Sequence, residues 1–373
     1  MSRRSDAAPD EPTFRQVVFG DLKQEGLHRR VRQDLRDLYS FYLSEERREQ
    51  LASMGAPRGI FMFWGWLLKS LLMKLSPSRR LALVIALVLL LWGEWQVRFL
   101  NVHVVVYVRV LGVLLLFMVL MLELKDKLLA RDEIEVARQV QLSLLPRTHP
   151  RLAGWSLWSH TRPANDVGGD LIDYIETNDH RLGVALGDVA GKGMGAALLM
   201  AKLQATLRAA VPDCRSLPDL GARLNSILLR DGPPNRFATL FYLEIAPNSG
   251  RVRYVNAGHP PGLILRANVT ESLASSSAPL GLIEGAVYAE GSVELKEGEI
   301  LFVYSDGLSE ARDAAEAEFG AERIQRLLPT LRGLTAQDAG ERMLKEVERF
   351  LGEARPHDDL SVMVLVRNGS GTA

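Results

Sequence analysis

The chain has 373 residues, enough for one domain of ordinary size together with a substantial second part. Its 45 basic and 45 acidic side chains cancel to a formal net charge of zero, so we expect no nucleic acid among its partners. The single cysteine, Cys214, excludes an intramolecular disulfide and a cysteine-based zinc site. The histidines lack the short helical spacing of a two-histidine metal site, which disfavours a site built from histidine.

The N-terminal third is predicted to meet a membrane. Residues 1–58 mix charged and apolar side chains at a mostly helical spacing, and we interpret them as a cytosolic helical arm. Residues 59–122 form the predicted membrane region, which begins with an interfacial helix at Ile60–Leu75. Leu81–Leu100 and Val104–Leu122 are predicted to form a transmembrane hairpin. A soluble helical hairpin buried against a partner is the alternative.

Charges that flank the predicted hairpin indicate its orientation. Basic residues lie on both of its outer sides, at Arg79, Arg80, Lys125, Lys127 and Arg131. Both termini are therefore expected in the cytoplasm. Residues 123–148 are predicted as a linker helix that ends at Pro146. An apolar stripe along this helix predicts a homodimer that carries a signal to the next domain, and a plain spacer helix is the alternative.

From Trp155 onward, short apolar alternations separated by glycine-bearing turns predict β-strands, with helices between them. The predicted strands are Trp155–His160, Leu171–Glu176, Leu182–Leu186, Ala238–Ile245, Arg251–Asn256, Gly262–Arg266, Ile300–Tyr304 and Leu360–Val366. The predicted helices are Met194–Ala210, Pro218–Leu229, Ala321–Leu331 and Ala336–Leu351. This pattern predicts an α+β domain in which two packed sheets are covered by helices.

Four acidic segments beside glycines are the candidates for chemistry. They are Val167–Asp170, Gly187–Gly193, Tyr304–Gly307 and His357–Leu360. Carboxylate oxygens with a backbone carbonyl select hard cations such as Mg²⁺ or Mn²⁺, and a site with so many acids can hold two. Two such ions can activate a water and clamp the oxygens of a phosphoryl group. A single Asp-Gly pair usually marks a turn, so only the set is informative.

One of these segments, Gly187–Gly193, superficially looks like a phosphate-binding loop before a helix. A Walker motif needs four residues between its first glycine and its Gly-Lys pair, followed by Ser or Thr. Here three residues intervene and Gly193 follows Lys192, which disfavours a nucleotide triphosphatase.

The ordered motifs resemble those of the PPM (type 2C) metal-dependent protein phosphatases, in particular their SpoIIE-like and RsbU-like bacterial branch. The motifs that carry the resemblance are Ala137–Gln141, Leu144–Pro146, Pro163–Asp170, Gly187–Gly193, Phe237–Thr239, Asn256–Pro261, Tyr304–Gly307 with Glu310–Ala311, and Asp358–Asp359. The resemblance spans about residues 133–366. It implies a β-sandwich of two antiparallel sheets flanked by helices, within a domain at 149–368 that precedes a disordered tail at 369–373.

The resemblance also implies an activity and a site. The implied reaction is the hydrolysis of phosphoserine or phosphothreonine on a protein with the help of two Mn²⁺ or Mg²⁺ ions. Asp170, Asp188, Asp306 and Asp358 correspond to the metal ligands through which catalysis proceeds, and the carbonyl of Val189 assists them.

Four further positions are interpreted with the same resemblance. Asp359 is expected behind the ligands rather than among them. The eukaryotic branch has a histidine where this chain has Ala190, so no general acid is assigned. His259 is expected to have a structural hydrogen-bonding role, and Arg162 to be an exposed strand-end arginine rather than a contact of the substrate phosphate.

The implied substrate is a phosphorylated anti-sigma-factor antagonist of the STAS type in a bacterial partner-switching pathway. The expected location is the bacterial cytoplasmic membrane, with the catalytic domain facing the cytoplasm. The main alternative is a catalytically inactive phosphatase-like domain that serves as a membrane-bound binding module. A membrane-anchored helical scaffold is a second alternative, but it explains none of the acids beside glycines.

Overall fold

The structure is a computed structural model that describes residues 50, 56–92, 95–99, 102–106, 108–146, 148–233, 235–267, 269–274 and 277–368. The chain divides into two compact units, Met1–Lys127 and Leu128–Ala373. Most of the predicted N-terminal arm and the predicted tail at 369–373 lie outside the described residues.

The described part of the first unit contains helices and one two-stranded hairpin. Its elements are α4 (Ala56–Lys74), α5 (Pro77–Trp92), β1 (Trp95–Phe99), β2 (Val102–Val106) and α6 (Val108–Leu144), which continues into the second unit. At the start of α5, Arg79 forms ion pairs with Glu123 and Asp126 of α6 at 2.8 and 2.6 Å. Gly112, near the start of α6, lies against the carbonyl of Ala86 in the later part of α5. These contacts make α5 and α6 antiparallel neighbours.

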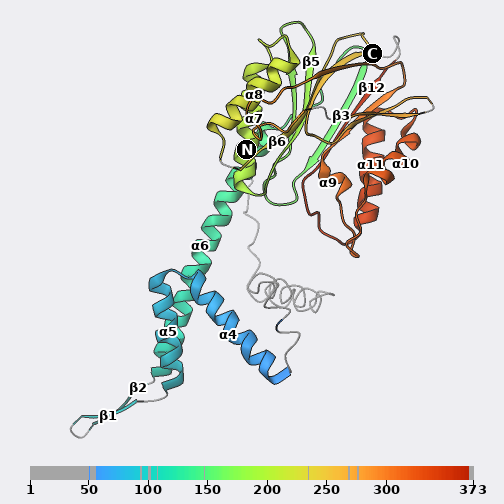
Figure 1. Ribbon diagram of the computed structural model, residues 1–373. Coiled ribbons are helices and arrows are strands. Elements are labelled where there is room, and N and C mark those ends of the chain that lie inside the picture. The colour runs from blue at the N-terminus through green and yellow to red at the C-terminus, as the bar shows by residue number, and fades with distance from the viewer. Residues whose placement is uncertain are drawn as a thin grey trace, which may run out of the picture. The chain divides into compact units, whose positions relative to one another are not determined.

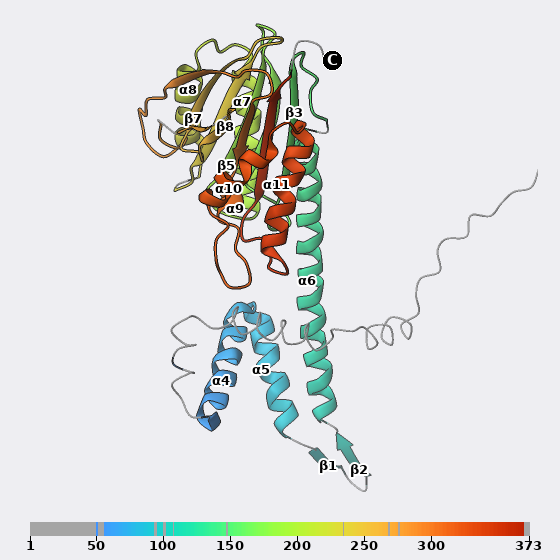
Figure 2. The same cartoon turned by 90° about the vertical axis from the view of Figure 1, so that its right-hand side faces the viewer.

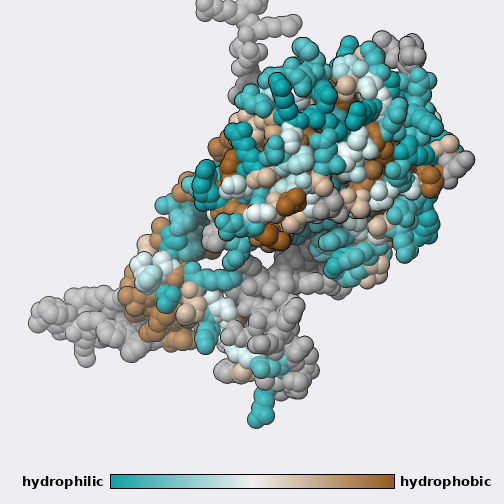
Figure 3. Space-filling view, turned by 45° about the horizontal axis from the view of Figure 1, so that its top comes forward, coloured by the Kyte–Doolittle hydropathy of each residue, from teal (hydrophilic) through white to brown (hydrophobic). Residues whose placement is uncertain are grey.

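Large apolar side chains of α5 and α6 remain exposed in this unit, where brown side chains gather in Figure 3. Those more than half exposed are Leu81, Leu91, Val110, Leu111, Val113, Leu114, Phe117 and Leu120. Among the helices of the described ranges, none combines the length and the apolar character that a membrane crossing requires. The predicted transmembrane hairpin is therefore not supported. The first predicted span is also wrong in structure, because α5 ends at Trp92 and the residues that follow form β1.

The second unit is a sandwich of two five-stranded antiparallel sheets with helices on both outer sides (Figure 1, Figure 2). One sheet has the order β10-β7-β6-β5-β4 and the other β3-β12-β11-β8-β9. The strands are β3 (Trp155–Arg162), β4 (Leu171–Glu176), β5 (Leu182–Val189), β6 (Ala238–Ile245), β7 (Arg251–Ala257), β8 (Gly262–Leu265), β9 (Thr270–Leu273), β10 (Glu290–Glu294), β11 (Ile300–Tyr304) and β12 (Leu360–Arg367). The helices are α7 (Met194–Ala210), α8 (Leu217–Asp231), α9 (Asp306–Ser309), α10 (Ala321–Leu327), a 3₁₀ turn at Leu328–Leu331 and α11 (Ala336–Leu351).

Alternating side chains of the strands fill three apolar layers. Leu186 and Phe241 lie in the middle layer between the two sheets, while Ala185, the neighbour of Leu186, faces the helices on the other side of its strand. α7 and α8 cover the first sheet with side chains such as Leu203, and α10 and α11 cover the second with side chains such as Met343. The fold is thus a four-layer arrangement of helix, sheet, sheet and helix.

The predicted α+β sandwich is confirmed, and every predicted strand and helix of this domain is present. Two strands were not predicted, β9 and β10. Each is the edge strand of its sheet, and both are short and partly exposed, so they lack the run of apolar residues that marks a central strand. The predicted linker helix is also present, since α6 continues without a break to Leu144.

Candidate active site

The four predicted acidic segments lie at one end of the sandwich, two on each sheet. In the first sheet, Asp170 precedes β4 and Asp188 lies near the end of β5, and these strands are antiparallel neighbours. In the second sheet, Asp306 follows β11 and Asp358 precedes β12, which are again antiparallel neighbours. The charges of Asp306 and Asp358 both raise the pKa of Asp188, so the acids of the two sheets lie close to one another across the sandwich.

Asp170 is the most deeply buried of these acids. Its side chain is 4% exposed, and neither carboxylate oxygen has a hydrogen-bond partner among the described residues. Burial, followed by the charge of Asp188, raises the pKa of Asp170 well above its usual range. A buried carboxylate without a partner is unfavourable unless a cation binds it. The chemistry of Asp170 therefore fits a metal ligand.

Two neighbouring acids, Asp188 and Asp306, also have raised pKa values. Burial, together with the charges of Asp306 and Asp358, raises the pKa of Asp188 to about 7. Burial and the nearby Glu310 and Asp358 also raise the pKa of Asp306. Like charges and loss of water both disfavour the ionised carboxylate, and a divalent cation would reverse this preference.

The four acids lie close enough to affect one another's pKa, but they do not form a complete metal-binding set. Within the described part of the chain, no set of three or more histidine, cysteine or acidic side chains surrounds a position suited to a metal ion. The donor chemistry fits a hard cation, whereas a closed coordination shell is not seen. The assignment of Asp170, Asp188, Val189, Asp306 and Asp358 as metal ligands therefore stays a prediction.

Both carboxylate oxygens of Asp359, unlike those of Asp170, accept hydrogen bonds from the backbone. Its Oδ1 accepts a hydrogen bond from the backbone N–H of Ala164 at 2.8 Å, and its Oδ2 accepts one from Gly169 at 2.5 Å. A Cβ at Gly168 would collide with this carboxylate, and a Cβ at Gly307 would collide with the backbone oxygen of Asp359. Asp359 thus fixes the turn before Asp170, and the adjacent glycines leave room for it.

His259 lies behind the site. Its Nδ1 lies 2.8 Å from the hydroxyl of Thr239, which pairs with Asp188 in the neighbouring strand. Burial lowers the pKa of His259 to about 3, so the imidazole is neutral at ordinary pH. The backbone N–H of His259 also donates to Asn256 Oδ1 at 2.8 Å. These contacts agree with the predicted structural hydrogen-bonding role.

Two basic residues near the acids differ in their orientation. Arg162 forms an ion pair with Glu348 of α11 at 3.2 Å, so its side chain extends along the outer face of its sheet. Lys192 lies at the site, because its Nζ is 3.0 Å from Asp358 Oδ2. The structure therefore agrees with the interpretation of Arg162 as a strand-end arginine and offers Lys192 as the cation next to the acids.

Two contacts at the site were not predicted from the sequence. Gln141 of α6 is buried and makes two hydrogen bonds with the backbone of Gly168. Its Nε2 donates to the carbonyl at 2.6 Å, and its Oε1 accepts from the N–H at 3.0 Å. Arg236 donates from Nη1 to the carbonyl of Ala190 at 2.6 Å. Gln141 belongs to a recognised motif, whereas no sequence signal connects Arg236 to Ala190.

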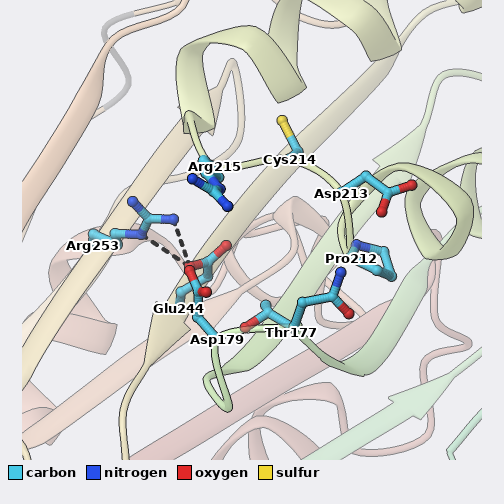
Figure 4. A pocket seen from close by; sticks show the side chains of 9 residues that line it. Thr177, Asp179, Pro212, Asp213, Cys214, Arg215, Glu244 and Arg253 are labelled. Atoms are coloured by element: carbon cyan, nitrogen blue, oxygen red, sulfur yellow. Dashed lines mark hydrogen bonds and ion pairs between the residues drawn. The ribbon is translucent and has the colours of Figure 1, made fainter.

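A separate polar hollow of about 160 Å³ lies at the opposite end of the first sheet (Figure 4). Two residues that line it show this position. Thr177 follows the far end of β4, and Glu244 lies near the far end of β6. Its buried carboxylate is already paired, because Arg253 and Arg181 lie 2.8 and 3.7 Å from Glu244. A strand of this length separates the hollow from the acids by about 17–20 Å, so it is not part of the candidate site.

Two packed antiparallel sheets with helices on both outer faces form a PP2C-like fold. The SiaA-PP2C domain of Pseudomonas aeruginosa shares this fold with a TM-score of 0.56, over 65% of this chain and 99% of that chain, at 18% identity. A sequence model of the family described as Stage II sporulation protein E (SpoIIE) matches residues 178–368, slightly more than half of the chain. The chain belongs to the SpoIIE family, which confirms the resemblance found in its motifs.

Curated relatives agree with this membership. The phosphoserine phosphatase RsbP of Bacillus subtilis (strain 168) is 30% identical over 188 residues, which are 49% of this chain and 46% of RsbP. The phosphoserine phosphatase RsbU of the same organism is 27% identical over 248 residues, 64% of this chain and 70% of RsbU. IcfG of Synechocystis sp. is 28% identical over 274 residues, 66% of this chain and 43% of IcfG. The chain thus spans less than half the length of IcfG and RsbP.

We expect Mn²⁺ to raise the melting temperature of the full-length chain, because a cation relieves the repulsion among the buried carboxylates. At a free concentration about 100 times its Kd, the ion contributes about 2.7 kcal/mol to the free energy of unfolding. Asp170→Asn should lose most of this shift in differential scanning fluorimetry. Asp166→Asn, at an exposed position of the same segment, should keep it. An equal shift in wild type and Asp170→Asn would contradict the assignment of Asp170.

Proposed function

We propose that the chain hydrolyses phosphoserine or phosphothreonine on a protein with the help of two Mn²⁺ or Mg²⁺ ions. The observation that carries this proposal is that Asp170, Asp188, Asp306 and Asp358 lie together at one end of the sandwich. The oxygens of Asp170 are buried and have no hydrogen-bond partner in the described part of the chain. Membership of the SpoIIE family and likeness to two phosphoserine phosphatases support it.

Some residues of the site would bind the ions, and others position the segments that carry them. The four aspartates and the carbonyl of Val189 would hold the ions. When bound, such ions lower the pKa of a water and neutralise the oxygens of the transferred phosphoryl group. Asp359 holds the turn before Asp170, and Thr239, which is hydrogen-bonded to His259, pairs with Asp188 in the neighbouring strand. Lys192 is about half exposed beside Asp358 and can offer a positive charge to an incoming phosphate.

The proposed substrate is a phosphorylated anti-sigma-factor antagonist of the STAS type in a partner-switching pathway, as in the bacterial branch that the motifs resemble. An inactive binding module for the same partner is the competing function. The presence of all four acids favours the enzyme, because a binding module has no need to keep carboxylates together at an energetic cost.

We also propose that residues 123–148 form a switch in a linker helix that precedes a phosphatase domain at 149–368. Gln141 ties this helix to the turn before Asp170. The carbonyl of Leu144, at the end of the helix, accepts hydrogen bonds from Gln204 and Arg208 of α7. A movement of α6 would therefore reach both the ligand turn and the helix that follows Gly187–Gly193. The exposed Leu129, Val136 and Val140 would provide the surface for a homodimer.

A further proposal concerns location. The exposed apolar side chains of α5 and α6 support association of the first unit with the bacterial cytoplasmic membrane, with the phosphatase domain on the cytoplasmic side.

The activity is tested by hydrolysis of p-nitrophenyl phosphate and of phosphoserine peptides by the full-length chain, with Mn²⁺, with Mg²⁺ and with EDTA. We expect turnover with either metal and none with EDTA. Asp306→Ala should abolish turnover while the domain stays folded, because it removes a metal ligand and opens no apolar cavity. A folded wild-type chain that binds Mn²⁺ but hydrolyses neither substrate would favour the binding module.

The linker contact is tested with Gln141→Ala. This change leaves the N–H and the carbonyl of Gly168 without their buried partner and loosens the turn before Asp170. We expect turnover to fall about 10- to 100-fold, as is usual when a residue that orients a metal ligand is removed. Gln139→Ala, on the exposed face of the same helix, should leave turnover unchanged. Equal activities of the two variants would argue against coupling through Gln141.

Membrane association is tested by fractionation of bacterial cells that express the full-length chain. We expect the chain to sediment with membranes. The double variant Leu114→Glu with Phe117→Glu should shift it to the soluble fraction, because both exposed apolar side chains become charged. Leu198→Glu, at an exposed position of the second unit, serves as the control. A wild-type chain found only in the soluble fraction would reject the proposal.

A further inference from the structure

The turn that follows Asp188 is held by a segment 46 residues further along the chain. The carbonyl of Ala190 accepts a hydrogen bond from Nη1 of Arg236 at 2.6 Å, and the N–H of Ala190 donates to the carbonyl of Phe237 at 2.9 Å. Both backbone groups of Ala190 are therefore engaged by two consecutive residues. Ala190 directly follows Val189, whose carbonyl is a predicted metal ligand.

The guanidinium of Arg236 lies directly on Gly191. A Cβ at Gly191 would overlap its Nη1, so a residue with a side chain cannot stand there while the contact exists. Gly191 also has a φ of 110°, a conformation that residues with a Cβ rarely adopt. The requirement for glycine at this point of Gly187–Gly193 thus has two physical causes, and one of them is Arg236.

The backbone that follows Arg236 is held by hydrogen bonds. Ala238 and Leu280 exchange two backbone hydrogen bonds, at 2.9 and 2.8 Å, and Ala238 also pairs with Val189 on its other side. The carbonyl of Arg236 lies close to Gly281, whose N–H donates to Asn225 of α8 at 2.8 Å. Arg236 thus reaches the Ala190 turn from a segment whose Ala238 is paired on both sides.

We propose that Arg236 is a positioning residue of the candidate active site. Its hydrogen bond to Ala190 fixes the turn so that the side chain of Asp188 and the carbonyl of Val189 keep their direction toward the bound ions. A charge-assisted hydrogen bond from a guanidinium is suited to this role, because it is short, directional and stronger than a neutral one. The inference rests on the proposed function, since it assigns to Arg236 an effect on the metal site.

The test is a Mn²⁺ titration of the full-length chain by thermal shift, in wild type, Arg236→Gln and Arg236→Lys. We expect Arg236→Gln to raise the half-saturating Mn²⁺ concentration about 10- to 100-fold. Arg236→Lys should recover part of this loss, because lysine keeps the charge but lacks the planar fork. Arg230→Gln is the matched control, since Arg230 is 72% exposed and pairs only with the adjacent Asp231 among the described residues. Its half-saturating concentration should equal that of wild type.

A second readout separates positioning from substrate binding. The KM for p-nitrophenyl phosphate at saturating Mn²⁺ should be the same in Arg236→Gln and in wild type. A raised KM with unchanged affinity for Mn²⁺ would overturn the proposal, because Arg236 would then act on the substrate. Unchanged values of both quantities would also overturn it.

Two further outcomes remain decisive. If Arg236→Gln fails to fold, Arg236→Lys carries the test alone, because lysine keeps the charge but lacks the planar fork. Wild-type affinity for Mn²⁺ in Arg236→Lys would then overturn the proposal. If the wild-type chain itself shows no shift with Mn²⁺ or Mg²⁺, the proposed function fails and the inference fails with it. A shift in wild type that persists in the variants refutes the inference alone.

Discussion

Carboxylates that lie close together repel one another and lose part of their hydration. This cost constrains the end of the sandwich where the buried Asp170 and the partly buried Asp188, Asp306 and Asp358 lie near one another. A fold keeps such a cluster only if the backbone around it is held in place and a cation can compensate the charge. Among the described residues, the oxygens of Asp170 have no hydrogen-bond partner, while the turn before Asp170 is held by hydrogen bonds to Asp359 and Gln141.

The supporting contacts come from distant parts of the sequence. Asp359 closes the turn before Asp170 from the opposite sheet, and Gln141 holds the same turn from α6. Thr239 and His259 support the strand of Asp188, and Arg236 holds the turn that follows it. Each predicted ligand segment of the first sheet is thus contacted by side chains of other elements. A change in one of those elements can therefore reach the predicted metal site without touching a predicted ligand. This arrangement would let α6 influence activity.

The sandwich could be predicted from the sequence, because its central strands show short apolar alternations and its helices lie between them along the chain. It did not predict β9 and β10, whose edge positions require little apolar surface. It predicted a helix up to Leu100, but a short strand pair forms there, because apolar β-branched residues such as Val97 and Val104 also suit strands. The acids beside glycines were found from the sequence, since their motifs are local. The contact of Arg236 with Ala190 was not, because it joins loops that only the folded sheet brings together.

The most direct measurement of the central claim is a crystal structure of the chain grown with Mn²⁺, with anomalous diffraction recorded at the manganese edge. We expect two anomalous peaks at the end of the sandwich, bounded by Asp170, Asp188, Asp306 and Asp358, with the Val189 carbonyl among the ligands. Full occupancy elsewhere, with no peak between these four aspartates in a well-ordered domain, would contradict it.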